Sequence, residues 1–103
     1  MRRLEIRPKA RREILLITLY LLENTGTEIA RRFDEALDDT FLELLHFPNI
    51  GAPKKVRGRK FAGIRMVQVK GFSNYLVFYL SREKGIAVER VFHAKQDYLR
   101  MLK

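Results

Sequence analysis

The chain changes its hydrophobic pattern at residues 47–53, and this change most restricts the folds open to it. The segment is Phe47-Pro48-Asn49-Ile50-Gly51-Ala52-Pro53, with two prolines and a glycine in seven residues. Residues of this kind interrupt regular structure, so we expect a turn that ends one element here. Before the turn, apolar residues recur at helical spacing, whereas from about residue 63 onward they follow strand patterns. A helical region is therefore predicted to precede a sheet.

The N-terminal segment is predicted to form a short strand followed by a helix. Leu4 and Ile6 alternate with charged residues, as in a strand with one buried face. Pro8 suits the first turn of a helix, where its missing N–H would be unpaired, and residues 9–24 continue the helical pattern. This helix is apolar around most of its circumference, more than one sheet face can cover. It is either central in the core or partly a surface for a partner.

A second helix is predicted to run to about His46. Thr25 and Glu28 have the spacing of a capping box at its start, and its apolar positions recur at i, i+3/i+4 and i+7. Paired carboxylates can act as acid–base catalysts, but at helical spacing on a polar face they predict a solvated surface. The carboxylates of that face are Asp34, Glu35, Asp38, Asp39 and Glu43.

Three strands are predicted in the second half, over residues 63–69, 75–80 and 86–93, with short connections between them. Residues 94–103 are weakly helical. Consecutive strands with short connections indicate an antiparallel meander. We therefore predict one α+β domain over residues 1–103: a helical hairpin packed on a small, mainly antiparallel sheet, in the order β-α-α-β-β-β, with or without a short C-terminal helix.

The composition argues against several classes of function. The chain has no cysteine and two histidines, so we expect no disulfide, no metal site and no cofactor. The longest apolar run, residues 14–22, is too short to cross a bilayer, and Glu5 and Arg7 stand where a signal peptide needs apolar residues. We expect a cytoplasmic protein without membrane contact.

The positive charge is concentrated in one segment. The net charge is +9, and residues 47–70 hold seven basic residues and no acid, whereas residues 27–46 hold six acids and two bases. This polarity favours a polyanion or an acidic protein as partner. A basic chain that is merely soluble is the simpler alternative, because charge alone identifies no partner.

The sequence resembles the ParE toxins of the ParE/RelE superfamily, from bacterial toxin–antitoxin modules, over nearly its whole length. The order and spacing of several short pieces carry the resemblance: Arg7-Pro8-x-Ala10, Ala30-x-x-Phe33 with Leu37, Thr40 and Leu44, Pro48-Asn49-Ile50-Gly51-Ala52-Pro53, Gly63-Ile64-Arg65, Tyr75-Leu76-Val77-Phe78-Tyr79, and Arg90-Val91-Phe92-His93-Ala94-Lys95-Gln96-Asp97.

The resemblance implies the toxin component of a type II toxin–antitoxin module, neutralised by a cognate antitoxin. ParE-like members are associated with inhibition of DNA gyrase, and RelE-like members cleave mRNA in the ribosome. An antitoxin helix is expected in a groove formed with the helical hairpin. We assign this contact to Leu15, Leu16, Leu19, Tyr20, Tyr75 and Tyr79. A homodimer and an antitoxin-bridged heterotetramer both fit so apolar a first helix.

A ribosome-dependent endoribonuclease is the alternative to a gyrase inhibitor that acts by binding alone. Cleavage by 2′-hydroxyl attack needs an acid–base pair and cations that stabilise the phosphorane. Arg65, Arg90 and His93 are the candidate catalytic residues. Each also has a structural explanation: the arginines share strand parity with apolar residues and are expected to pair internally. His93 is expected to hydrogen-bond the terminal turn.

The basic residues of the segment are the candidates for contact with the target. They are Lys54, Lys55, Arg57, Arg59, Lys60 and Arg65. Their density favours phosphate contacts, and hence a nuclease, whereas the motifs above favour a gyrase inhibitor.

Tyr75 and Tyr79 share one strand face and are expected in the core or in a groove wall. A degenerate toxin, kept for its contact with the antitoxin, is the third option.

Overall fold

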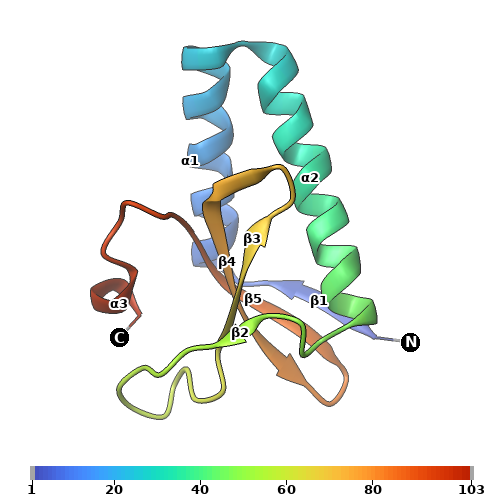
Figure 1. Cartoon of the computed structure of the whole chain (residues 1–103), viewed down its shortest axis with the longest axis vertical. Coiled ribbons are helices and arrows are strands. Elements are labelled where there is room, and N and C mark those ends of the chain that lie inside the picture. Colours follow the sequence, from blue (N-terminus) through green and yellow to red (C-terminus); the bar gives the residue numbers. More distant parts are fainter. Residues whose placement is uncertain (1, 103) are drawn as a thin grey trace.

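The structure is a computed structural model that describes residues 2–102. The predicted order β-α-α-β-β-β is confirmed, with one additional two-residue strand after the helices and a short C-terminal helix (Figure 1). The elements are β1 Arg3–Ile6, α1 Pro8–Thr25, α2 Thr27–His46, β2 Ala52–Pro53, β3 Arg65–Val69, β4 Phe72–Arg82, β5 Gly85–His93 and α3 Tyr98–Met101.

The five strands form one sheet in the order β1-β5-β4-β3-β2. The β3–β4–β5 meander is antiparallel, as predicted, and β2 also pairs with β3 in antiparallel orientation. β1 is the exception, because it pairs with β5 in parallel from Arg3↔Gly85 to Ile6↔Val88. The sheet is therefore mixed but mainly antiparallel, and the α+β prediction is confirmed.

A single glycine joins the two helices of the hairpin. Gly26 has φ of 96°, a conformation that favours glycine, and its N–H donates to the Leu21 carbonyl at the end of α1. The predicted capping box is wrong, because the Thr25 hydroxyl donates to the Leu21 carbonyl at 2.6 Å. Thr25 therefore belongs to the last turn of α1 and does not cap α2.

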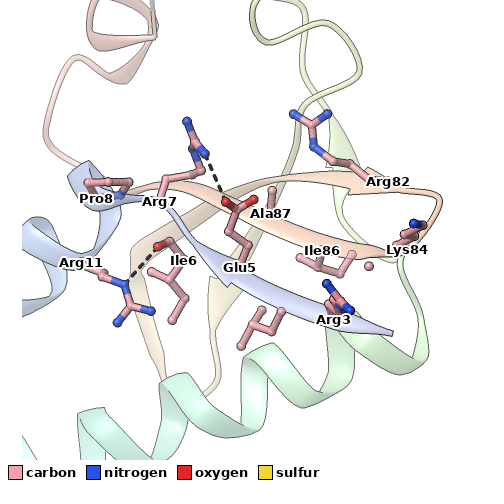
Figure 2. Close-up of a pocket in the computed structure, with 12 residues that line it drawn as sticks. Arg3, Glu5, Ile6, Arg7, Pro8, Arg11, Arg82, Lys84, Ile86 and Ala87 are labelled. Atoms are coloured by element: carbon pink, nitrogen blue, oxygen red, sulfur yellow. Dashed lines mark hydrogen bonds and ion pairs between the residues drawn. The ribbon is translucent and has the colours of Figure 1, made fainter. Parts of the chain in front are cut away.

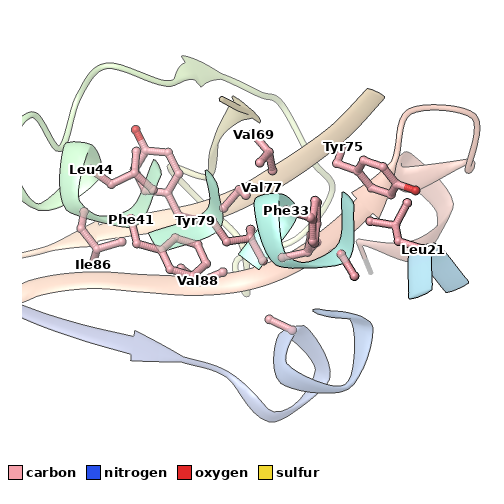
Figure 3. Close-up of a cluster of buried hydrophobic side chains, with 14 residues drawn as sticks. Leu21, Phe33, Phe41, Leu44, Val69, Tyr75, Val77, Tyr79, Ile86 and Val88 are labelled. Carbon is pink, nitrogen blue, oxygen red and sulfur yellow. The ribbon is translucent and has the colours of Figure 1, made fainter. Parts of the chain in front are cut away.

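The helices cover one face of the sheet. Phe33, Leu37 and Leu44 of α2 pack against Val77 and Tyr79 of β4, so the predicted apolar stripe of the second helix is confirmed (Figure 3). The opposite face is covered by the segment before β3 and by the C-terminal segment. Its buried residues are Phe61, Ile64, Leu76, Phe78, Leu80, Phe92 and Leu102. β4 is consequently buried on both faces over residues 75–80.

The open question about the first helix is resolved by its burial. Only Ala10 and Leu21 of α1 are buried, although the helix is apolar on most sides. Ile14 and Ile17 pack partly buried against the core. The other large apolar side chains form an apolar band that is 43–58% exposed, made of Leu15, Leu16, Leu19, Tyr20 and Leu22. α1 thus has a surface of the kind that partners cover. Within residues 2–102, no helix is long and apolar enough to cross a membrane.

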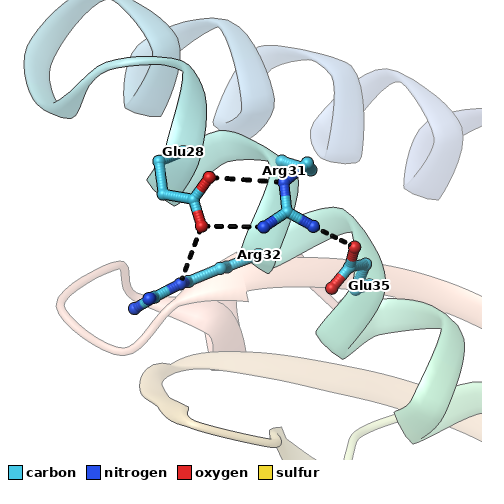
Figure 4. Close-up of polar contacts among 4 residues, drawn as sticks. All are labelled: Glu28, Arg31, Arg32 and Glu35. Carbon is cyan, nitrogen blue, oxygen red and sulfur yellow. Dashed lines mark hydrogen bonds and ion pairs between the residues drawn. The ribbon is translucent and has the colours of Figure 1, made fainter.

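The polar face of α2 is solvated, as predicted. Near its start, Arg31 forms ion pairs with Glu28 and Glu35, and Arg32 also reaches Glu28 (Figure 4). All four side chains are more than half exposed, so these pairs add little to stability. The pKa of Asp38 on the same helix is raised mainly by partial burial, and to a smaller extent by repulsion from Asp34 and Asp39.

A half-buried carboxylate joins α1 to the edge of the sheet. Glu13 accepts hydrogen bonds from Nε and Nη2 of Arg90, the shorter at 2.6 Å, and from the Val91 N–H at 3.0 Å. β1 ends opposite Val88, so Val91 lies beyond its reach. Nη1 of Arg90 donates to the Met101 carbonyl at 3.0 Å, which ties the C-terminal segment to the same group.

Substitution Glu13→Ala should lower the free energy of unfolding by about 3 kcal/mol, because it leaves Arg90 only 11% exposed without its charge partner. Urea denaturation measures the loss. Glu28→Ala, which removes an exposed carboxylate from α2, is the control and should leave the midpoint almost unchanged. Equal effects of the two substitutions would contradict the structural role of the pair.

Candidate functional site

The cationic side chains lie on a loop that is anchored from within. We call residues 54–64 the basic loop. The Lys54 N–H donates to the Ile64 carbonyl at 3.0 Å and closes the base of the loop. Phe61 and Ile64 are buried in the core of the second sheet face. The side chains of Lys55, Arg57, Arg59 and Lys60 remain exposed. The loop can therefore meet an anionic surface without unfolding.

The turn that precedes the basic loop is fixed from below. The Tyr79 hydroxyl accepts a hydrogen bond from the Gly51 N–H at 2.8 Å and donates one to the Pro48 carbonyl at 2.9 Å. Nη1 of Arg65 donates to the carbonyls of Asn49 at 3.1 Å and Gly51 at 2.7 Å. A Cβ atom on Gly51 would lie 2.6 Å from the Tyr79 hydroxyl oxygen, so only glycine fits here.

The assignment of Tyr79 to the antitoxin surface is wrong. Tyr79 is fully buried beneath the turn, and its hydroxyl is bonded there. Tyr75 has the same strand parity but lies four residues earlier, where β4 passes α1. It is 8% exposed and contributes to a cavity beside that helix. The predicted position of both tyrosines in the core or in a groove wall is confirmed.

The apolar band of α1 borders two hollows. On one side, a cavity of about 500 Å³ lies between α1 and the end of the sheet, and Leu16, Tyr20, Tyr75 and His93 are among its lining residues. On the other side, Leu15 faces a groove between α1 and α2 that Asp34 and Asp38 also line. A partner laid along α1 could place apolar side chains into both hollows.

The three candidate nuclease residues do not converge. Arg90 pairs with Glu13, and Arg65 binds the carbonyls of the turn. Nδ1 of His93 accepts a hydrogen bond from the Lys95 N–H at 3.0 Å, as expected for a histidine that binds the terminal turn. In the strand register, Arg65 of β3 lies opposite Tyr79 of β4, and His93 of β5 lies opposite Tyr75 of β4. Arg65 and His93 are therefore on different strands and about 13 Å apart along the strand direction. Each side chain thus has an internal role.

A second basic surface surrounds β1, and the sequence did not reveal it. A cavity of about 730 Å³ lies beside this edge strand, with Arg3, Arg7, Arg82 and Lys84 among its lining residues (Figure 2). Arg7 pairs with Glu5 at 3.2 Å there. These cations come from two distant segments, and only the pairing of β1 with β5 brings them together. No charge cluster in the sequence could have indicated this.

Phe47 and Ile50 are also surface residues that the sequence did not single out. They are 62% and 51% exposed, respectively, on the turn before the basic loop. The available signal was weak: two apolar residues among breakers, in a segment where loops are usually polar. Among the residues that the structure describes, no group of three or more histidine or acidic side chains could hold a metal ion.

The comparisons establish first the fold and then the family. The fold matches a solved structure described as the chromosomal ParDE TA system from P. aeruginosa, with a TM-score of 0.70 and 19% sequence identity, over 90% of this chain and 96% of that chain. The family follows from the sequence: the family model for the ParE toxin of type II toxin–antitoxin systems, parDE, matches residues 4–98. The chain therefore belongs to the ParE toxin family. No curated protein matches it.

Substitution Tyr79→Phe should lower the free energy of unfolding by about 2 kcal/mol at neutral pH, because it leaves the Gly51 N–H and the Pro48 carbonyl without their partner. Urea denaturation tests this, with the exposed Tyr20→Phe as a control that should change little. Equal unfolding midpoints for Tyr79→Phe and the wild type would contradict this account of the turn.

The same tyrosine should make stability depend on pH. Burial raises the pKa of Tyr79, so its contribution is complete below the unfolded-state pKa of about 10 and is lost as pH rises through the folded-state value. Urea denaturation between pH 8 and pH 11 should show a steeper loss for the wild type than for Tyr79→Phe. Parallel curves would show that the phenol does not titrate differently on folding.

Proposed function

We propose that this ParE family member is a toxin that inhibits DNA gyrase by binding it, without catalysing a reaction, and that a cognate antitoxin neutralises it. The family supports the toxin assignment. The observation that carries the mode of action is the contrast between two sets of cations. Lys55, Arg57 and Arg59 are exposed on an anchored loop, whereas Arg65 and Arg90 are bound internally.

The basic loop is the proposed contact with the target. Its exposed cations, which include Lys60, and the partly exposed Lys54 match an anionic protein surface or the DNA that gyrase holds. Arg65 supports this contact indirectly, because its Nη1 holds the turn that precedes the loop. Charges of one sign on an exposed loop raise the association rate and help to orient the partner. Gyrase acts in the bacterial cytoplasm, so we place the toxin there as well. Ribosome-dependent mRNA cleavage is the alternative that the assay below separates.

The apolar band of α1 is the proposed antitoxin surface. Leu15, Leu16, Leu19 and Tyr20 are 43–58% exposed, and Tyr75 lines the adjoining cavity. A helix laid in this groove would cover them through apolar side chains at i, i+3, i+4 and i+7. The neighbour from P. aeruginosa is described as a ParDE system, which supports a dedicated antitoxin. We expect acidic residues of the antitoxin to meet the basic loop.

The loop should control gyrase inhibition. We expect the purified wild-type chain to abolish supercoiling and to leave mRNA intact in a parallel ribosome reaction. Lys55→Glu/Arg57→Glu should raise the half-inhibitory concentration about tenfold, because both charges reverse at the target, and the effect should shrink at high salt. Arg82→Glu/Lys84→Glu makes the same charge change at the exposed end of β4 and in the turn that follows it, and is the control. Intact supercoiling with cut mRNA would refute gyrase as the target.

The apolar band should control antitoxin binding. Leu16→Glu/Leu19→Glu should weaken the complex with the cognate antitoxin by about 30-fold or more, because the substitutions bury charge in the contact. Leu42→Glu alters a leucine of α2 that is 54% exposed and serves as the control. Calorimetric titration measures both affinities, and light scattering of the complex distinguishes a homodimer from an antitoxin-bridged heterotetramer. Unchanged affinity for the α1 variant would place the antitoxin elsewhere.

A further inference from the structure

The 47–51 turn carries two large apolar side chains that the protein itself does not cover. Phe47 is 62% exposed and Ile50 is 51% exposed. Together with His46, Pro48 and Asn49 they line a shallow hollow of about 440 Å³ at the end of α2. Two large apolar residues so close in sequence, around one hollow, form a local patch rather than scattered exposure.

This patch is held in place before any partner arrives. Tyr79 and Arg65 together bind the carbonyls of Pro48, Asn49 and Gly51. The turn also closes on itself, because the Ile50 N–H donates to the Phe47 carbonyl at 3.1 Å. A surface that is already ordered loses little conformational entropy on binding, so its contacts contribute more fully to affinity. Rigid apolar anchors of this kind dominate the binding energy of protein interfaces.

The charges next to the patch define what can cover it. The chain continues through β2 into Lys54 and Lys55, and Lys54 lies at most about 15 Å from Ile50 along the extended chain. Residues 47–70 contain no acid, so the patch is followed by positive charge only. The complementary partner therefore presents an apolar side chain flanked by carboxylates.

A protein fits this surface better than a nucleic acid does. Stacking of successive bases along a nucleic-acid strand needs aromatic rings that present flat faces. Here the rings of His46 and Phe47 are tilted by 41°, with centroids 6.4 Å apart, and they stand beside the aliphatic side chains of Ile50 and Pro48. The arginine nearest to the patch, Arg65, already gives its Nη1 donor to the turn carbonyls. An apolar hollow in a turn that leads directly into Lys54 and Lys55 matches the apolar centre and polar rim of protein interfaces.

We propose that the 47–51 turn is the anchor through which this toxin docks on an acidic protein surface, with an apolar side chain of that protein seated between Phe47 and Ile50. The basic loop then orients the approach, and the turn supplies most of the affinity. This inference rests on the proposed function, because it assigns the part of the toxin that grips its target.

The test compares the wild type with Phe47→Ser/Ile50→Ser. Both side chains are exposed, so circular dichroism and the urea midpoint should remain those of the wild type. The half-inhibitory concentration in gyrase supercoiling should rise about 30-fold or more, and growth arrest on induction in bacteria should be lost. Leu42→Ser, which removes a leucine of α2 that is 54% exposed, is the control and should inhibit as the wild type does.

The outcomes separate the two proposals. A double variant that still inhibits gyrase and arrests growth overturns the anchor while the proposed function stands. Growth arrest without gyrase inhibition overturns the proposed function, and the anchor then stands or falls by whether the double variant still arrests growth. Fluorescence anisotropy with a 30-base-pair DNA duplex and a single-stranded RNA completes the test. If the double variant loses nucleic-acid affinity by the same factor as it loses gyrase inhibition, the proposal of a protein partner is overturned. A wild type that neither inhibits gyrase nor arrests growth would overturn it as well.

Discussion

The hydrogen bonds and the ion pair of the Glu13 carboxylate are the interactions that fix how α1, the sheet and the C-terminal segment are arranged. β1 covers the edge of β5 only as far as Val88, and beyond that point the Val91 N–H donates to Glu13 in place of a neighbouring strand. The same carboxylate holds Arg90, which in turn binds the Met101 carbonyl. One group on α1 thus fixes the helix to the sheet and the C-terminal segment to the opposite face. Either the Glu13 carboxylate or the Arg90 guanidinium would be costly to bury without its partner, so the two charges stay paired.

This arrangement explains why the two faces of the sheet offer different surfaces. The helix-covered face buries the stripe of α2 but uses little of α1, so the apolar band stays at the surface. The second face is closed by the basic loop and by the C-terminal segment, whose helix α3 has four residues. Apolar side chains that anchor the loop from within also direct its cations outward. The same burial that completes the core therefore creates the charged surface.

Periodicity predicted most of the fold, because each helix and long strand has a regular pattern that depends only on local sequence. Contacts between distant segments were harder to predict. Strand parity indicated that Arg90 would pair with a carboxylate, but Glu13 lies 77 residues away and could not be identified from parity. Tyr75 and Tyr79 have the same parity, yet one lines a cavity and the other is buried under a turn, since their positions along β4 differ. The two-residue β2 has too few residues for any pattern.

The distance between the two proposed surfaces constrains how an antitoxin could act. α2 has 20 residues and is about 30 Å long, with the end of α1 beside its start and the 47–51 turn at its end (Figure 1). A helix seated on the apolar band alone would leave the turn and the basic loop open to a target. Neutralisation by direct occlusion then needs a further segment of about ten extended residues to follow α2 to the turn. That path passes the acidic face of α2, where Asp34, Asp38 and Asp39 disfavour an acidic segment. An antitoxin that occludes both surfaces is therefore expected to change charge along its length, from neutral or basic beside α2 to acidic at the basic loop.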